Sequence, residues 1–104
     1  MTVMSDPCPC GYDSRTQPIT WEDGYALSLH YDKIRKFLDI VVRDNSRWLG
    51  VLRCTNCGRL WGEDAISSGQ ADFHYVYPIA ATNPEAWLAS AEPLVLPHRR
   101  DKSS

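Results

Sequence analysis

Large apolar residues alternate with small or polar residues without interruption between Tyr25 and Asp32. This period of two favours a β-strand, because successive side chains of a strand point to opposite faces. The same stretch also carries an apolar stripe at helical spacing, which makes a helix the alternative. The alternating apolar residues are Tyr25, Leu27, Leu29 and Tyr31, and the helical stripe is Leu27, Tyr31, Ile34 and Leu38. We favour the strand, because the alternation holds over eight positions.

Two apolar runs, residues 37–42 and 48–52, flank a segment with turn chemistry, Asp44-Asn45-Ser46. This arrangement predicts a β-hairpin. A three-residue loop would place Arg43 opposite Arg47, where two like charges repel. We therefore expect the register that pairs Asp44 with Arg47 and sets Arg43 across from Trp48.

The second half of the chain predicts further strands and one helix. Residues 58–62 continue as a strand or turn, and residues 67–70 read as a loop. Residues 72–77 alternate again, and Pro78 limits the pairing of that strand, which ends there or lies at an edge. Residues 82–89 predict a short helix, with Thr82 or Asn83 as the cap and Pro84 and Glu85 in the first turn. Trp87 and Leu88 would dock it on the sheet.

These elements predict a small, metal-stabilised, β-rich α+β domain with an antiparallel sheet and a short C-terminal helix. The length of 104 residues fits one domain. We expect a flexible leader at residues 1–7, a loop at 12–20, a single zinc-binding domain at 8–96 and a flexible basic tail at 97–104. The start of the chain lacks the features of a secretory signal, and no apolar stretch is long enough to span a bilayer. A cytoplasmic location is the default expectation.

The four cysteines occur as two close pairs, each followed by glycine. In a reducing compartment such pairs are more often metal ligands than disulfides. Structural zinc sites commonly use four cysteines in a tetrahedron, which leaves no open position for water or substrate. We therefore expect one structural Zn²⁺ bound by all four thiolates. The predicted ligands are Cys8, Cys10, Cys54 and Cys57.

The two segments, Cys8-Pro9-Cys10-Gly11 and Cys54-Thr55-Asn56-Cys57-Gly58, resemble the zinc-ribbon family, as does the strand that leads into Cys54. In that family two cysteine knuckles at the tips of β-hairpins clamp one zinc ion. The first knuckle here is Cys-x-Cys, where the ribbon pattern has Cys-x₂-Cys, and the gap between the knuckles is longer than in a minimal ribbon. The resemblance implies a structural metal and no single function.

Other fates of the four thiols are less favoured. The cysteines can stay reduced and unliganded, form a redox-sensing disulfide, or hold an iron–sulfur cluster. His74 or His98 can replace one cysteine as ligand. A catalytic zinc would need one cysteine to stay outside the coordination shell.

The remaining residues point to binding rather than catalysis. The chain has no Gly-rich phosphate loop and no catalytic serine or deaminase signature. Net charge is −2, with seven of the eleven Lys and Arg residues between positions 33 and 59 and none between 60 and 98. This basic block, with its aromatic residues, could form a nucleic-acid surface. The candidate residues are Lys33, Arg35, Lys36, Arg43, Arg47, Trp48, Arg53 and Arg59.

Our leading hypothesis is a non-enzymatic domain that acts through protein–protein binding, for example as an inhibitor or immunity-type protein. Aromatic residues are favoured anchors of interfaces, and acidic neighbours would attract a basic partner. The expected surface consists of Trp61, Glu63, Asp64, Phe73, Tyr75 and Tyr77. The alternatives are the nucleic-acid-binding regulator and, third, an enzyme with a partly open zinc site.

Overall fold

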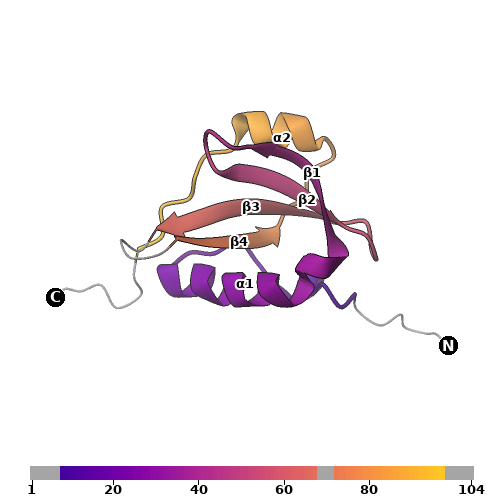
Figure 1. Ribbon diagram of the computed structural model, residues 1–104, viewed down its shortest axis with the longest axis horizontal. Coiled ribbons are helices and arrows are strands. Elements are labelled where there is room, and N and C mark those ends of the chain that lie inside the picture. Colours follow the sequence, from indigo (N-terminus) through magenta and orange to yellow (C-terminus); the bar gives the residue numbers. More distant parts are fainter. Residues whose placement is uncertain (1–7, 68–71, 98–104) are drawn as a thin grey trace.

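A four-stranded antiparallel sheet forms the centre of the protein. The computed structural model describes residues 8–67 and 72–97. Its strands follow one another in a meander, each hydrogen-bonded to the next: β1 (Leu38–Asp44), β2 (Leu49–Cys54), β3 (Leu60–Ser67) and β4 (Asp72–Pro78) (Figure 1). The predicted α+β class with an antiparallel sheet is confirmed. The strand predicted at 72–77 is confirmed too: β4 lies at an edge and ends at Pro78, which cannot donate to a ladder.

The strand predicted at residues 25–31 is wrong, because this segment belongs to helix α1 (Trp21–Ile34). Thr20 and Asp23 form a capping box: the Thr20 hydroxyl accepts from the Asp23 N–H and the Asp23 carboxylate accepts from the Thr20 N–H. The helical stripe, not the alternation, faces the core: Leu27, Tyr31 and Ile34 are buried, whereas Tyr25 and Leu29 are exposed. The threonine three residues before an acid was the sequence signal for this helix.

The hairpin between β1 and β2 exists, but both registers considered from the sequence are wrong. Asp44 pairs with Leu49 and Arg43 with Gly50, so four residues form the turn. Asp44 accepts hydrogen bonds from Ser46 and from the Arg47 guanidinium within the turn. The Arg47 guanidinium also donates to two carbonyl groups of the C-terminal helix region, which removes this residue from the ladder.

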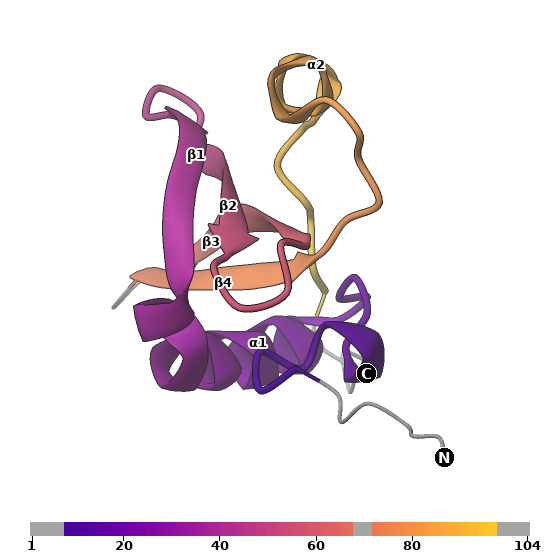
Figure 2. The same ribbon diagram turned by 90° about the vertical axis from the view of Figure 1, so that its right-hand side faces the viewer.

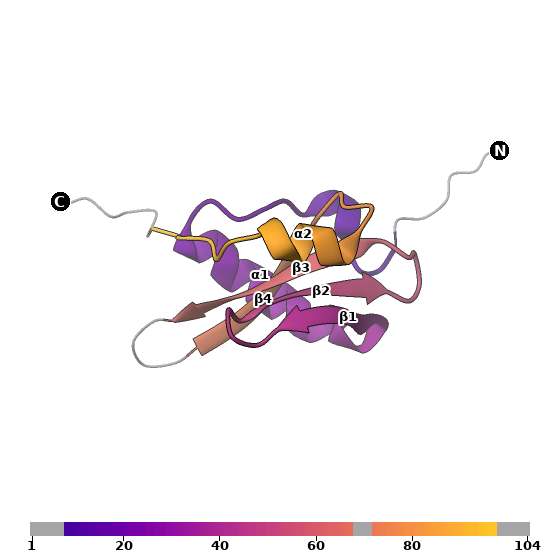
Figure 3. The same cartoon turned by 90° about the horizontal axis from the view of Figure 1, so that it is seen from above.

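Two helices lie on opposite sides of the sheet (Figures 1 and 3). Helix α2 (Pro84–Ser90) begins as the sequence predicts, with Asn83 accepting from the Ala86 N–H and proline in the first turn. Leu88 is buried, and the Trp87 ring contacts the Tyr77 ring at 6.4 Å, which docks the helix on the sheet. Beyond α2 the chain returns toward α1, where the Trp21 N–H donates to the Pro97 carbonyl at 2.7 Å.

The sheet twists strongly, so that β1 stands steeply while β4 lies flat over α1 (Figure 2). The predicted leader at 1–7, most of the loop at 67–70 and the tail from residue 98 lie outside the described residues, while Ser67 closes β3 and Pro97 bonds to Trp21. Within the described part of the chain, no helix has both the length and the apolar character required to cross a membrane.

Candidate metal centre

The first cysteine pair lies in a tight turn before α1. The Gly11 N–H donates to the Cys8 carbonyl at 3.0 Å, and Gly11 has a left-handed φ of 76° that a side chain would strain. Two contacts attach this turn to the rest of the fold. His30 of α1 lies 2.6 Å from the Cys10 carbonyl through Nε2, and the Tyr12 hydroxyl donates to the Ile79 carbonyl at 2.7 Å. The turn is therefore held at a fixed position beside the sheet.

The second pair follows directly from β2, of which Cys54 is the last residue. The Gly58 N–H donates to the Cys54 carbonyl at 2.8 Å, and the Cys54 N–H donates to the Arg59 carbonyl at 2.9 Å. Gly58 adopts φ 79°, so the chain reverses here as it does after the first pair. The predicted position of this knuckle at the end of a rigid strand is confirmed.

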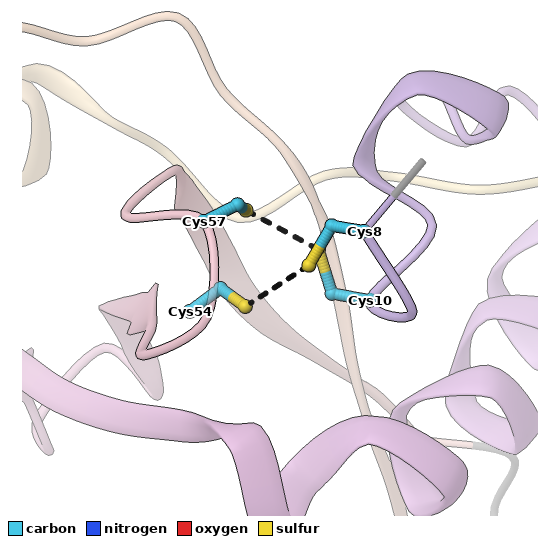
Figure 4. Close-up of side chains that lie close together, drawn as sticks. All are labelled: Cys8, Cys10, Cys54 and Cys57. Carbon is cyan, nitrogen blue, oxygen red and sulfur yellow. Dashed lines mark hydrogen bonds between the residues drawn. The ribbon is translucent and has the colours of Figure 1, made fainter. Parts of the chain in front are cut away.

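The four sulfurs of Cys8, Cys10, Cys54 and Cys57, here called the sulfur cage, all lie within 4.8 Å of one another. Figure 4 shows the two pairs facing each other, with 3.6 Å between the sulfurs of Cys8 and Cys54 and 3.6 Å between those of Cys10 and Cys57. Sulfurs about 2.3 Å from a common ion in a tetrahedron lie about 3.8 Å apart. The cage therefore has the size of a mononuclear tetrathiolate site.

None of the four cysteines forms a disulfide. A separation of 3.6 Å is far longer than the S–S bond of about 2.05 Å. The centre of so small a cage has room for one ion but not for the several irons of a cluster. His74, considered as a replacement ligand, does not belong to the cage and lies instead 3.8 Å from the Glu63 carboxylate. His98 lies outside the described residues.

Asn56 connects the two halves of the cage. Its backbone N–H donates to the Cys54 sulfur at 3.4 Å, and its side-chain amide donates across the cage to the Cys8 sulfur at 3.1 Å. Such bonds stabilise thiolates and fix the direction of their lone pairs. Asn56, His30 and Tyr12 were not predicted from the sequence as supporting residues. For Asn56 the only signal was an amide side chain between two cysteines.

The thiols differ in acidity. Burial raises the pKa of Cys8, but hydrogen bonds from Asn56, from the Cys10 backbone and from the neighbouring thiols outweigh it and lower that pKa to about 6. Burial raises the pKa of Cys10, which is fully buried, and that of Cys57. The cage thus offers a ready thiolate at Cys8, while a metal ion must displace protons from Cys10 and Cys57, which makes binding dependent on pH.

The expected partner surface is not a surface. Five of its six side chains are buried, and only Phe73 is half-buried, so the expectation of exposure is wrong. Each has a role inside the fold: Trp61 lies beneath the cage against Tyr12, and Asp64 accepts from the Leu94 N–H at 2.8 Å. The aromatic side chains of β4 pack against a helix and the C-terminal segment rather than facing solvent. The five buried residues are Trp61, Glu63, Asp64, Tyr75 and Tyr77.

The basic block does not form one free cationic face. Arg43 pairs with Glu63, Arg47 with Asp44, and Arg59 with Asp13. Arg35 lies 3.6 Å from Asp32, and the Lys36 ammonium lies over the Phe37 ring. Lys33 and Arg53 are exposed, and Trp48 is half exposed at the tip of the β1–β2 hairpin. Much of the positive charge is thus neutralised within the chain.

Comparison with protein-family models, with curated proteins and with solved structures finds no match to this chain.

Proposed function

We propose that the sulfur cage binds one Zn²⁺ as a structural ion and that the protein is a non-enzymatic domain acting through protein–protein binding. The observation that carries the proposal is the cage itself: four sulfurs face one another at tetrahedral spacing. Four cysteine ligands match the preference of zinc and fill its coordination shell. A zinc ion in this shell has no position for water or substrate, so it would stabilise the fold rather than catalyse a reaction.

The ion would join parts of the chain that are distant in sequence. Cys8 and Cys54 are 46 residues apart, and Cys10 and Cys57 are 47 apart. A bridge between them fixes the N-terminal turn against the end of β2, next to the buried core of Trp61 and Val76. A domain of this size buries a modest core, and such a staple adds the stability that the core lacks.

Exposed apolar side chains support the binding part of the proposal. Tyr25 and Leu29 are 39% and 49% exposed on one face of α1, where residues four apart are neighbours. Ile40 on the edge strand and Trp48 on the hairpin are 56% and 51% exposed. Large apolar side chains of this kind serve as anchors in protein interfaces. An inhibitor or immunity-type protein is one concrete form of this function.

The nucleic-acid alternative has weaker support, because Arg43, Arg47 and Arg59 are all engaged in ion pairs. It predicts binding to single- or double-stranded DNA or RNA at low salt, where phosphate contacts are strongest. Absence of binding under these conditions would exclude it.

Two measurements test the main proposal. Metal analysis of protein purified without added metal should find about one zinc per chain. The zinc content and the folded fraction should fall in the same proportion. Affinity capture should then compare the native protein with Leu29→Glu and Ile40→Glu, which keep the core intact. A partner that binds the native protein and is lost from either variant at unchanged melting temperature supports the proposal; equal capture by all three contradicts the binding surface.

A further inference from the structure

A cleft with a volume of about 700 Å³ opens between α1, the tip of the β1–β2 hairpin and the first half of β4. This volume falls in the range of small-ligand pockets. The cleft lies at the opposite end of β2 from the sulfur cage, since β2 starts beside Trp48 and ends at Cys54. None of its lining residues is a cysteine. The lining combines aromatic and charged groups: Ser28, Tyr31, Asp32, Arg35, Arg43, Asn45, Trp48, Glu63, Asp72, Phe73 and His74.

A buried ion pair forms the floor of the cleft. The Glu63 side chain is only 5% exposed and accepts two hydrogen bonds of 3.0 Å from the Arg43 guanidinium. The two residues lie on β3 and β1, and Gly50 of β2 lies between them in the ladder. A Cβ atom at position 50 would lie 2.9 Å from the Glu63 carboxylate, so glycine leaves the space that the pair crosses. The floor is thus built by three strands.

An exposed tryptophan forms one wall. The Trp48 ring stacks on the His74 ring at 5.8 Å with an angle of 3° between the planes. Its backbone has a φ of 60°, a left-handed conformation that is strained for a bulky residue and that glycine or asparagine would adopt more easily. The chain therefore keeps an aromatic ring at the mouth of the cleft where the turn itself favours a different residue. Phe73 adds a second aromatic ring, whereas the buried Tyr31 ring is covered by the Arg35 guanidinium, which lies 5.2 Å from the ring centroid.

The charge of the cleft is negative when His74 is neutral, because three carboxylates and two guanidiniums line it. Both guanidiniums already have partners within the chain, Arg43 with Glu63 and Arg35 with Asp32. Asp72 has no ion pair within the described residues and lies at the mouth, beside Phe73. A phosphate or carboxylate ligand would meet these acids, whereas a cation would meet both the acids and the faces of aromatic rings.

We propose that this cleft receives an arginine side chain presented by a partner protein. This inference rests on the proposed protein-binding function and names the chemistry of the partner. A guanidinium is planar, stacks on aromatic faces and binds carboxylates through two parallel hydrogen bonds, so it fits a site with Trp48 as a wall and Asp72 at the rim. Its aliphatic stem would lie against Phe73.

The probe for the first experiment is the acetylated, amidated tripeptide Gly-Arg-Gly. Its matched control contains citrulline, which keeps the shape of arginine and lacks the charge. Titration into ¹⁵N-labelled protein should shift the indole N–H signal of Trp48 in a saturable manner, and the citrulline peptide should bind at least about fivefold more weakly. Equal binding of the two peptides, stronger binding of a Gly-Glu-Gly peptide, or stronger binding of a ten-residue oligothymidylate would overturn the proposal.

Two variants locate the binding in the cleft. Trp48→Asn removes the aromatic wall and relieves the strain of the left-handed backbone conformation, so the melting temperature should stay within a few degrees. The affinity for the arginine peptide should fall about fivefold or more. Asp72→Asn should lower the affinity for the arginine peptide about twofold to threefold. The matched control is Asp39→Asn, which makes the same charge change on β1 outside the cleft and should leave affinity unchanged. An effect of Asp39→Asn as large as that of Asp72→Asn would show a general charge effect and contradict the site.

This result can be separated from the proposed function. If Trp48→Asn still captures the protein partner of the native chain, and the arginine peptide does not bind, the cleft is not the docking site while the binding function remains. If the capture of partners does not depend on Leu29 or Ile40 but the arginine peptide binds the cleft, the arginine-binding proposal is supported. The proposal that the exposed apolar surface binds a partner is then contradicted.

Discussion

The sulfur cage and the cleft lie at opposite ends of β2 and differ in how the chain builds them. The cage takes all its ligands from two short turns, and its four sulfurs face inward onto one another. The cleft takes its lining from α1 and the residue after it, from one turn and from three strands, and the exposed Trp48 and His74 stand around a floor formed by the buried Glu63. The first is closed around a single point, and the second is open to solvent. Under the two proposals made above, stability and recognition would be separated along one strand.

The largest expected effect is the loss of the cage. Cys54→Ser removes a fully buried thiol of the cage at the end of β2. If the cage binds zinc as proposed, the variant should lose its cooperative unfolding transition or melt at a much lower temperature, because structural metal binding is coupled to folding. Circular dichroism and metal analysis measure both effects. Thr55→Ser, an exposed position between the same two ligands, is the control and should leave both unchanged. A metal-free native protein with the same melting temperature as the purified one would contradict the structural role of the metal.

The second prediction concerns the floor of the cleft. Arg43→Leu leaves the buried Glu63 carboxylate without its partner and should lower the free energy of unfolding by about 3 kcal/mol. Glu63→Leu should cost less, because the Arg43 side chain is 35% exposed and regains contact with water. The double variant should recover most of the loss, since an apolar pair replaces the ion pair. Urea denaturation of the three variants measures this order, and equal losses in both single variants would contradict the assignment of Glu63 as the buried member.

The same contrast explains what the sequence could predict. The spacing of cysteine and glycine in each knuckle is local, so the grouping of the four cysteines could be predicted from the sequence, as could the cap at Asn83 and the edge strand that ends at Pro78. The register of the β1–β2 hairpin did not follow, because Arg47 is drawn out of the ladder by carbonyl groups some forty residues away. The cleft could not be predicted from the sequence either, because it depends on where α1 crosses the sheet. Residues 25–31 fit both a strand period and a helical period; the strand was preferred, and the packing of Leu27 and Tyr31 into the core shows that the helical period was the correct one.

The third prediction tests whether the hydrogen bond that crosses the cage supports metal binding. Asn56→Ala removes the hydrogen bond that crosses from one knuckle to the Cys8 sulfur. Partners of metal ligands typically contribute about 10-fold or more to metal affinity, so competition with a chelator should show a loss of about 10-fold. Asn56→Asp keeps the size but offers no N–H group and adds negative charge, so its loss should be larger. Thr55→Ala is the neighbouring control, and a loss equal to that of Asn56→Ala would show that the knuckle responds to any change.

The smallest expected effect is a pH dependence of stability that arises from Asp64, a buried carboxyl group of β3. Burial raises the pKa of Asp64, despite the hydrogen bonds that it accepts from the Leu94 and Ala65 N–H groups. The folded state therefore holds this proton more tightly than the unfolded state, so the contribution of Asp64 to stability is largest below its ordinary pKa and declines as the pH rises toward the raised value. Asp64→Asn does not titrate. The difference in free energy of unfolding between this variant and the native protein should shift in favour of the variant as the pH rises through that window. Comparing the two proteins at each pH cancels the effect of metal release on both, and a difference that stays constant with pH would show that the Asp64 carboxyl has the same pKa in the folded and unfolded states.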